Sequence, residues 1–163
     1  MAITLKQEAV VDTWSQIIEG GAGHEKEVMQ NTFKLLTDAR IPNVKVRQDE
    51  VRMGTFAGVR RDFILLAPEG SIKEFAMWIT ARDYGANLDA GWYLTYHAMG
   101  FKIRRYKPQE AVNRLNMFSQ QDLASYLMVA HHCLLNSLEM LYKQLELDPP
   151  SWDRKSRGFL EVW

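Results

Sequence analysis

Residues 78–96 read WITARDYGANLDAGWYLTY, and this stretch decides the fold class of the chain. Two aromatic runs with strand-like alternation flank a polar segment, residues 82–89, which contains a glycine. Successive side chains of a strand point to opposite faces, and here both faces of both runs carry large residues. A sheet with one solvated face shows cleaner polar alternation. We therefore expect the second face to be partly covered, by the protein's own tail or by a partner.

Further strand patterns lie upstream of this stretch. Val44 and Val46 share one parity and Val51 and Met53 have the other, so the polar group between them is predicted to form a bulge or a turn. An apolar run follows at residues 62–67. The connections GTFAG and PEGS are typical of loops between antiparallel neighbours. The sequence predicts an antiparallel sheet of about four strands.

Helical spacing predicts two helices before the sheet. Thr4 is expected to cap the first, whose apolar face runs through Val10, Trp14 and Ile17. A cluster of glycines ends this helix, and the second is expected over residues 24–39.

The longest predicted helix covers residues 119–147, with Ser119 and Asp122 as a capping pair and two prolines beyond its end. Its wide apolar stripe indicates contact with more than one surface. The predicted fold is a single α+β domain of order ααββββα over residues 1–148, with this helix packed on the sheet, followed by an aromatic docking tail at 149–163. The centre of the helix's apolar face consists of Leu123, Leu127, Ala130, Leu134, Leu138, Leu141 and Leu145.

The glycine cluster GGAGHEKEV at residues 20–28 admits two interpretations. Backbone N–H groups at a helix start attract anions, which would suit a phosphate. A phosphate-binding loop, however, follows a strand, whereas a helix is predicted here, and Glu25 and Glu27 already occupy the first turn. A turn between two helices is the favoured interpretation.

Composition and charge limit the function classes. The chain has 163 residues, a hydrophobic fraction of 47% and no net charge, values that suit one globular domain rather than a disordered or strongly basic protein. Cys133 is the single cysteine, and no leader or long apolar stretch is present, so we expect a cytoplasmic protein without a membrane span. Residues 40–108 carry twelve Lys and Arg against seven Asp and Glu, while 1–39 and 109–150 each carry three more acids than bases.

The polar segment 82–89 is the first candidate site, through Arg82, Asp83, Asn87 and Asp89. Its oxygens could bind a hard cation, and Asp83 could act as an acid or base beside Arg82. The spacing matches no EF-hand loop, and Asp, Asn and Gly are also what a tight turn requires. We predict a structural loop, with ligand or partner contact as the alternative, and expect no metal and no cofactor.

Two adjacent histidines lie on the long helix, but they project to different faces. His131 falls among leucines, whereas His132 falls among polar residues, so the pair lacks the spacing of a zinc site. His131 is predicted to be a hydrogen-bonded histidine in or beside the core, with ligand binding as the alternative. Cys133 points about 100° away from His132 on the helix, which argues against a thiolate–imidazole pair.

A basic segment, FKIRRYK at residues 101–107, interleaves cations with aromatic residues. This pattern suits single-stranded nucleic acid or another anionic partner, provided that further arginines converge on it in space. The predicted basic patch consists of Arg60, Arg61, Lys102, Arg104, Arg105 and Lys107.

The tail SWDRKSRGFLEVW carries Trp152, Phe159 and Trp163 among charged residues. Tails rarely expose such residues to solvent, so these three are predicted to form an interface, either with the body of the same chain or with a neighbour.

From these patterns we expect a non-enzymatic binding or assembly module that acts through protein–protein contacts and self-associates as a homo-oligomer. One alternative is an anion- or nucleic-acid-binding protein that uses the basic patch. Another is a small-molecule enzyme with a carboxylate site between the sheet and the long helix, formed by Asp83, Asp89 and His131.

Overall fold

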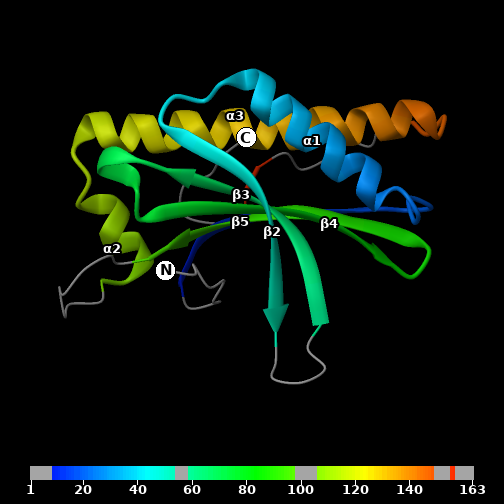
Figure 1. The fold of residues 1–163 in the computed structure, drawn as a ribbon, viewed down its shortest axis with the longest axis horizontal. Coiled ribbons are helices and arrows are strands. Elements are labelled where there is room, and N and C mark those ends of the chain that lie inside the picture. The colour runs from blue at the N-terminus through cyan, green and yellow to red at the C-terminus, as the bar shows by residue number, and fades with distance from the viewer. Residues whose placement is uncertain (1–8, 54–58, 98–105, 149–154, 157–163) are drawn as a thin grey trace.

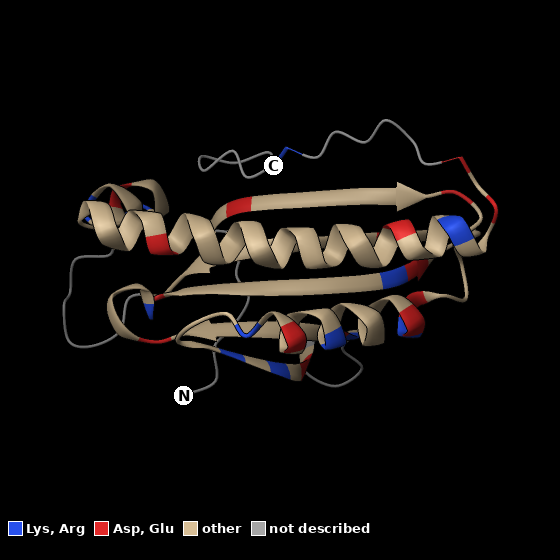
Figure 2. Cartoon of the chain, turned by 90° about the horizontal axis from the view of Figure 1, so that it is seen from above, with Lys and Arg blue, Asp and Glu red and all other residues tan. Residues whose placement is uncertain are grey.

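The computed structural model describes residues 9–53, 59–97, 106–148 and 155–156. Five antiparallel strands form one sheet in the order β1-β5-β4-β3-β2, and two helices, α1 and α3, lie side by side over one of its faces (Figures 1 and 2). The elements in chain order are β1 (Val10–Ile18), α1 (Glu25–Ala39), β2 (Val44–Met53), β3 (Val59–Pro68), the short 3-10 turn η2 (Gly70–Ile72), β4 (Phe75–Tyr84), β5 (Asn87–Tyr96), α2 (Pro108–Asn113) and α3 (Met117–Gln144).

The α+β class, the antiparallel sheet and the long C-terminal helix are confirmed, but the predicted element order was wrong. The described residues contain five strands rather than four, and three helices of which two follow the sheet. None of these helices is long and apolar enough to cross a membrane.

The main correction is at residues 10–18, where a strand replaces the predicted first helix. Val11, Trp14 and Ile18 are buried, and their spacing mimics a helix. In the strand, an irregularity between Val10 and Asp12 brings Val11 into the same core as Trp14 and Ile18. β-branched side chains, frequent in this stretch, favour the extended form.

The second correction concerns β2, which is continuous through residues 48–50 and pairs with β3 over ten consecutive positions. The apolar parity changes for another reason. Val44 and Val46 pack on the core beneath the helices, whereas Val51 packs on a second cluster with Phe63. A strand that contributes to two cores on opposite faces reverses its apolar pattern without a bulge.

The second face of the sheet carries its own small core. Phe63, Leu65, Ala76 and Trp78 are at most 4% exposed, and Tyr93 packs against them. Within this cluster the indole N–H of Trp78 donates to the hydroxyl of Thr95 at 3.0 Å. This explains why both faces of the aromatic strands carry large side chains.

Helix α3 supplies most of the helical side of the main core. Of the residues predicted to form the centre of its apolar face, all are buried except Leu145, which is partly buried. The helix begins earlier than predicted: the side chain of Asn116 caps it by accepting from the N–H of Ser119 at 2.9 Å. Ser119, the predicted cap, instead hydrogen-bonds the hydroxyl of Ser71 at 2.9 Å.

Candidate functional site

The sheet divides at its centre. β3 and β4 pair only where Ile64–Leu66 meets Met77–Ile79. By contrast, β2 pairs with β3, and β4 with β5, along the full length of each hairpin. The β2–β3 and β4–β5 hairpins therefore diverge, as Figure 1 shows. We call this opening between β3 and β4 the fork.

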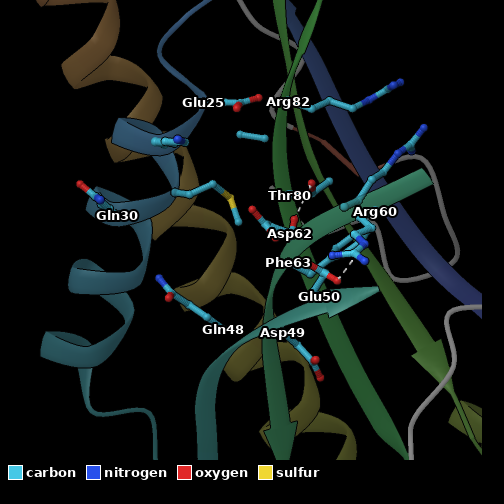
Figure 3. Close-up of a pocket in the computed structure, with 14 residues that line it drawn as sticks. Glu25, Gln30, Gln48, Asp49, Glu50, Arg60, Asp62, Phe63, Thr80 and Arg82 are labelled. Atoms are coloured by element: carbon cyan, nitrogen blue, oxygen red, sulfur yellow. Dashed lines mark hydrogen bonds and ion pairs between the residues drawn. The ribbon is translucent and has the colours of Figure 1, made fainter. Parts of the chain in front are cut away.

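A cleft of about 530 Å³ lies in the fork. The first two turns of α1 form one wall, and side chains of β2, β3 and β4 form the other. Figure 3 shows Glu25 and Gln30 on the helix side and Asp62 and Thr80 on the strand side. The cleft is lined by Glu25, Lys26, Met29, Gln30, Gln48, Asp49, Glu50, Arg60, Arg61, Asp62, Phe63, Thr80, Ala81 and Arg82.

Two strand edges face each other across the fork. The C=O of Asp62 points towards β4 and accepts from Oγ1 of Thr80 at 3.1 Å. The N–H of Asp83 points away from β5 and donates to a glutamate of α1 at 3.2 Å. Backbone groups of alternate residues in an antiparallel strand point to the same side, so those of Arg60 and Ala81 also face the gap. The cleft is therefore lined by backbone donors and acceptors as well as by side chains.

The charged side chains of the cleft are of both signs. Arg60 Nε lies 3.7 Å from a carboxylate oxygen of Glu50. Asp62 stands directly opposite Glu50 in the β2–β3 register, and like charges in this position repel each other. Among the described residues, no hydrogen bond or ion pair engages the Asp62 carboxylate, and no cluster of His, Cys, Asp and Glu has a geometry that could hold a metal ion.

The polar segment 82–89 does not converge on one site. Arg82 and Asp89 are direct cross-strand partners, and both Nε and Nη2 of Arg82 contact Oδ2 of Asp89, at 3.1 and 3.0 Å. The Arg82 guanidinium also lies over the ring of Tyr84, 5.2 Å from its centroid. Gly85 has a φ of +63°, as the first central residue of a type II′ hairpin turn requires.

The glycine cluster contacts the other half of the polar segment. The N–H of Gly23 donates to both carboxylate oxygens of Asp83, at 2.9 and 3.0 Å, and that of Gly20 donates to Oδ1 of Asn87 at 3.3 Å. The cluster joins a strand to a helix, so the predicted helix–helix turn was wrong. The anion at these donors is the chain's own Asp83. Gly20 and Gly23 thus form one unit with Asn87 and Asp83, which we call the glycine clasp.

His131 is fully buried. Its Nδ1 accepts the indole N–H of Trp92 at 2.9 Å, and its ring meets Trp14 edge to face at 5.0 Å between centroids. The structure therefore does not bring it together with Asp83 and Asp89. His132 is exposed, and burial raises the pKa of the Cys133 thiol.

The predicted basic patch is assembled only in part. Arg60 and Arg61 meet at the cleft together with Arg82, but four carboxylates line the same cleft. Lys107 lies at the N-cap of α2, which Figure 1 shows away from the loop end of the β2–β3 hairpin. Lys102, Arg104 and Arg105 lie outside the described residues.

Of the predicted tail, only residues 155–156 are described. Ser156 is buried, and its hydroxyl donates to Oδ2 of Asp12 on β1 at 2.8 Å. Trp152, Phe159 and Trp163 lie outside the described residues.

Sequence reasoning missed Asp62, Thr80 and Glu25 as site residues. Their meeting depends on where β3 and β4 separate and on where α1 begins, and no local pattern encodes either. Comparisons with protein-family models, with curated proteins and with solved structures found no match.

Proposed function

We propose that this protein is a non-enzymatic binding module that recognises an extended segment of a partner protein by adding it to the sheet in the fork. The separation of β3 and β4 after a short pairing carries this proposal. It leaves backbone donors and acceptors along both sides of a cleft. Strand addition uses such groups for affinity and the neighbouring side chains for specificity.

The two outer edges of the sheet offer a contrast. Exposed edges invite pairing, and proteins protect them with charges or local caps. Lys45 and Arg47 are exposed on β2. On β1, the N–H of Thr13 donates to its neighbour Asp12, and the Gln16 side chain donates to the backbone C=O of the next residue. The edges of β3 and β4 that face the fork lie inside the sheet, and residues of both strands line the cleft.

The distribution of reactive groups among the described residues supports the non-enzymatic part of the proposal. Asp83 is engaged by the glycine clasp, Asp89 by Arg82, and His131 by Trp92 in the core. An acid–base mechanism needs such groups within reach of one substrate atom. The charge balance at the cleft also gives no large positive field of the kind that nucleic-acid binding requires.

Selection from a displayed library of short random peptides, followed by hydrogen exchange and NMR on the isotope-labelled full chain, tests the proposal. A selected peptide should slow exchange of the Arg60 and Ala81 amides, while amides in the middle of α3 stay unchanged. Failure to select any peptide, or perturbations confined to another surface, would refute the fork as the binding site.

Self-association stays a separate prediction. Its test is the mass in solution by light scattering with and without residues 151–163. A monomer unaffected by the truncation would contradict it.

A further inference from the structure

We infer that the segment received by the fork alternates basic and aliphatic residues, with the basic side chains directed towards α1. This inference rests on the proposed function and specifies the chemistry of its partner. Side chains of an added strand point alternately to the two faces of the sheet, so each face of the fork selects every second residue.

The face towards α1 is acidic. Among the described residues that line the cleft on this face, the charged side chains are Glu25, Glu50 and Asp62 against Lys26 and Arg60, so carboxylates outnumber cations by one. Glu50 has Arg60 as a neighbour, whereas Asp62 stands opposite Glu50 without a cation of its own among the described residues. A lysine or arginine of the partner placed here would relieve the repulsion between the two carboxylates.

The Glu25 carboxylate contributes in another way. Because it accepts the N–H of Asp83, it is held at the rim of the cleft rather than turned into solvent. Asp83 in turn is fixed by the N–H of Gly23. The acidic wall is therefore pre-organised by the glycine clasp, which lowers the entropy lost on binding a cation.

The opposite face carries two large apolar side chains at its mouth, and Arg61 and Arg82 line the cleft on the same face. Val59 on β3 and Tyr84 on β4 are each 62% exposed, unusual values for large apolar side chains on strands. They share the face of Phe63, which lines the cleft. An aliphatic residue between them would be covered from both sides. Arg82 on this face is already paired with Asp89, so it is less available to an anionic ligand than an unpaired arginine would be.

The length of the segment follows from the fork. The separated parts are residues 59–63 of β3 and 80–84 of β4. At roughly 3.3 Å per residue they match an extended segment of about four or five residues. Such a segment places two or three side chains on each face.

Three labelled synthetic peptides test the inference by fluorescence anisotropy. The first alternates lysine and valine, the second alternates glutamate and valine, and the third has the composition of the first in two blocks. The alternating basic peptide should bind about tenfold or more tightly than either of the others, a difference of about 1.4 kcal/mol. NMR on the same sample should place it at Ala81 and Arg60.

Charge reversal provides the second arm. Asp62→Lys should remove the preference for the basic peptide, and Asp38→Lys, the same change on an exposed residue of α1 outside the cleft, should keep it. Equal binding of basic and acidic peptides at the fork would overturn the inference and leave the proposed function standing. No binding at the fork by any peptide, including those selected from the random library, would overturn both.

Discussion

Replacing His131 with phenylalanine should destabilise the protein, because it leaves the buried indole N–H of Trp92 without its acceptor. The imidazole Nδ1 accepts the indole N–H of Trp92 at 2.9 Å, and both residues are 0% exposed. An indole N–H can only donate, so the Trp92 group keeps its need for an acceptor when the imidazole is removed. Phenylalanine retains a flat ring against Trp14 but offers no acceptor.

The magnitude follows from the cost of a buried donor without a partner, about 1–3 kcal/mol. In a domain of this size each kcal/mol corresponds to about 2–4 °C in Tm, so the expected loss is about 2–12 °C. His131→Gln, which retains an acceptor, should lose less than His131→Phe. The double variant His131→Phe with Trp92→Phe should lose less than the sum of its two single variants, because the orphaned donor is removed along with its partner.

Chemical denaturation monitored by far-UV circular dichroism measures these differences. His132→Phe is the matched control, since it makes the same change at the next, exposed position and should stay within about 0.5 kcal/mol of the parent. If His131→Phe unfolded at the same denaturant concentration as His132→Phe, the hydrogen bond to Trp92 would contribute nothing to stability and the reasoning would be refuted.

Three further predictions concern the rest of the fold. Asp83→Ala should speed amide exchange at Gly23 and cost about 1 kcal/mol, because the glycine clasp loses its acceptor; unchanged exchange would contradict it. Thr32→Val should stabilise the protein by about 1 kcal/mol in the same denaturation assay, since the Thr32 hydroxyl is buried without a hydrogen-bond partner among the described residues; a loss of stability would count against it. Burial raises the pKa of Tyr126 above its ordinary value of 10.0, so stability should be intact below pH 10.0 and fall as the pH rises beyond it. Tyr126→Phe should reduce that fall in denaturation midpoints measured across alkaline pH, and an unchanged slope would argue against it.

The elements that were predicted well from the sequence have one buried face and repeat their apolar residues at a single, regular spacing. α1 and α3 repeat their apolar residues at helical spacing, and α1 lies within a residue of its predicted bounds. Residues 10–18 failed because Trp14 and Ile18, four apart, share a face in a helix and in a strand alike. Periodicity alone could not distinguish a helix from a strand here. Residues 10–18 form a strand because they pair with β5 at the edge of the sheet.

The candidate site was less predictable than the fold. Asp62 and Glu50 become neighbours only through the register of β2 against β3. The contact of Gly23 with Asp83 joins residues 60 positions apart. Asp62 and Glu50 looked locally ordinary in the sequence, so composition and spacing pointed to the polar segment and not to the fork.

The glycine clasp explains why the most polar stretch of the sequence is not the site that we propose. Backbone N–H groups at the start of a helix would bind an anion, but here Asp83 already fills that position and Asn87 the one beside it. Arg82 on β4 and Asp89 on β5 form an ion pair with each other. Asp83 thus fixes the start of α1 against the end of β4, and Asn87 holds the glycine cluster that leads into the helix. That attachment holds α1 over the point where β3 leaves β4, and so it makes the fork a walled cleft instead of an open gap in the sheet.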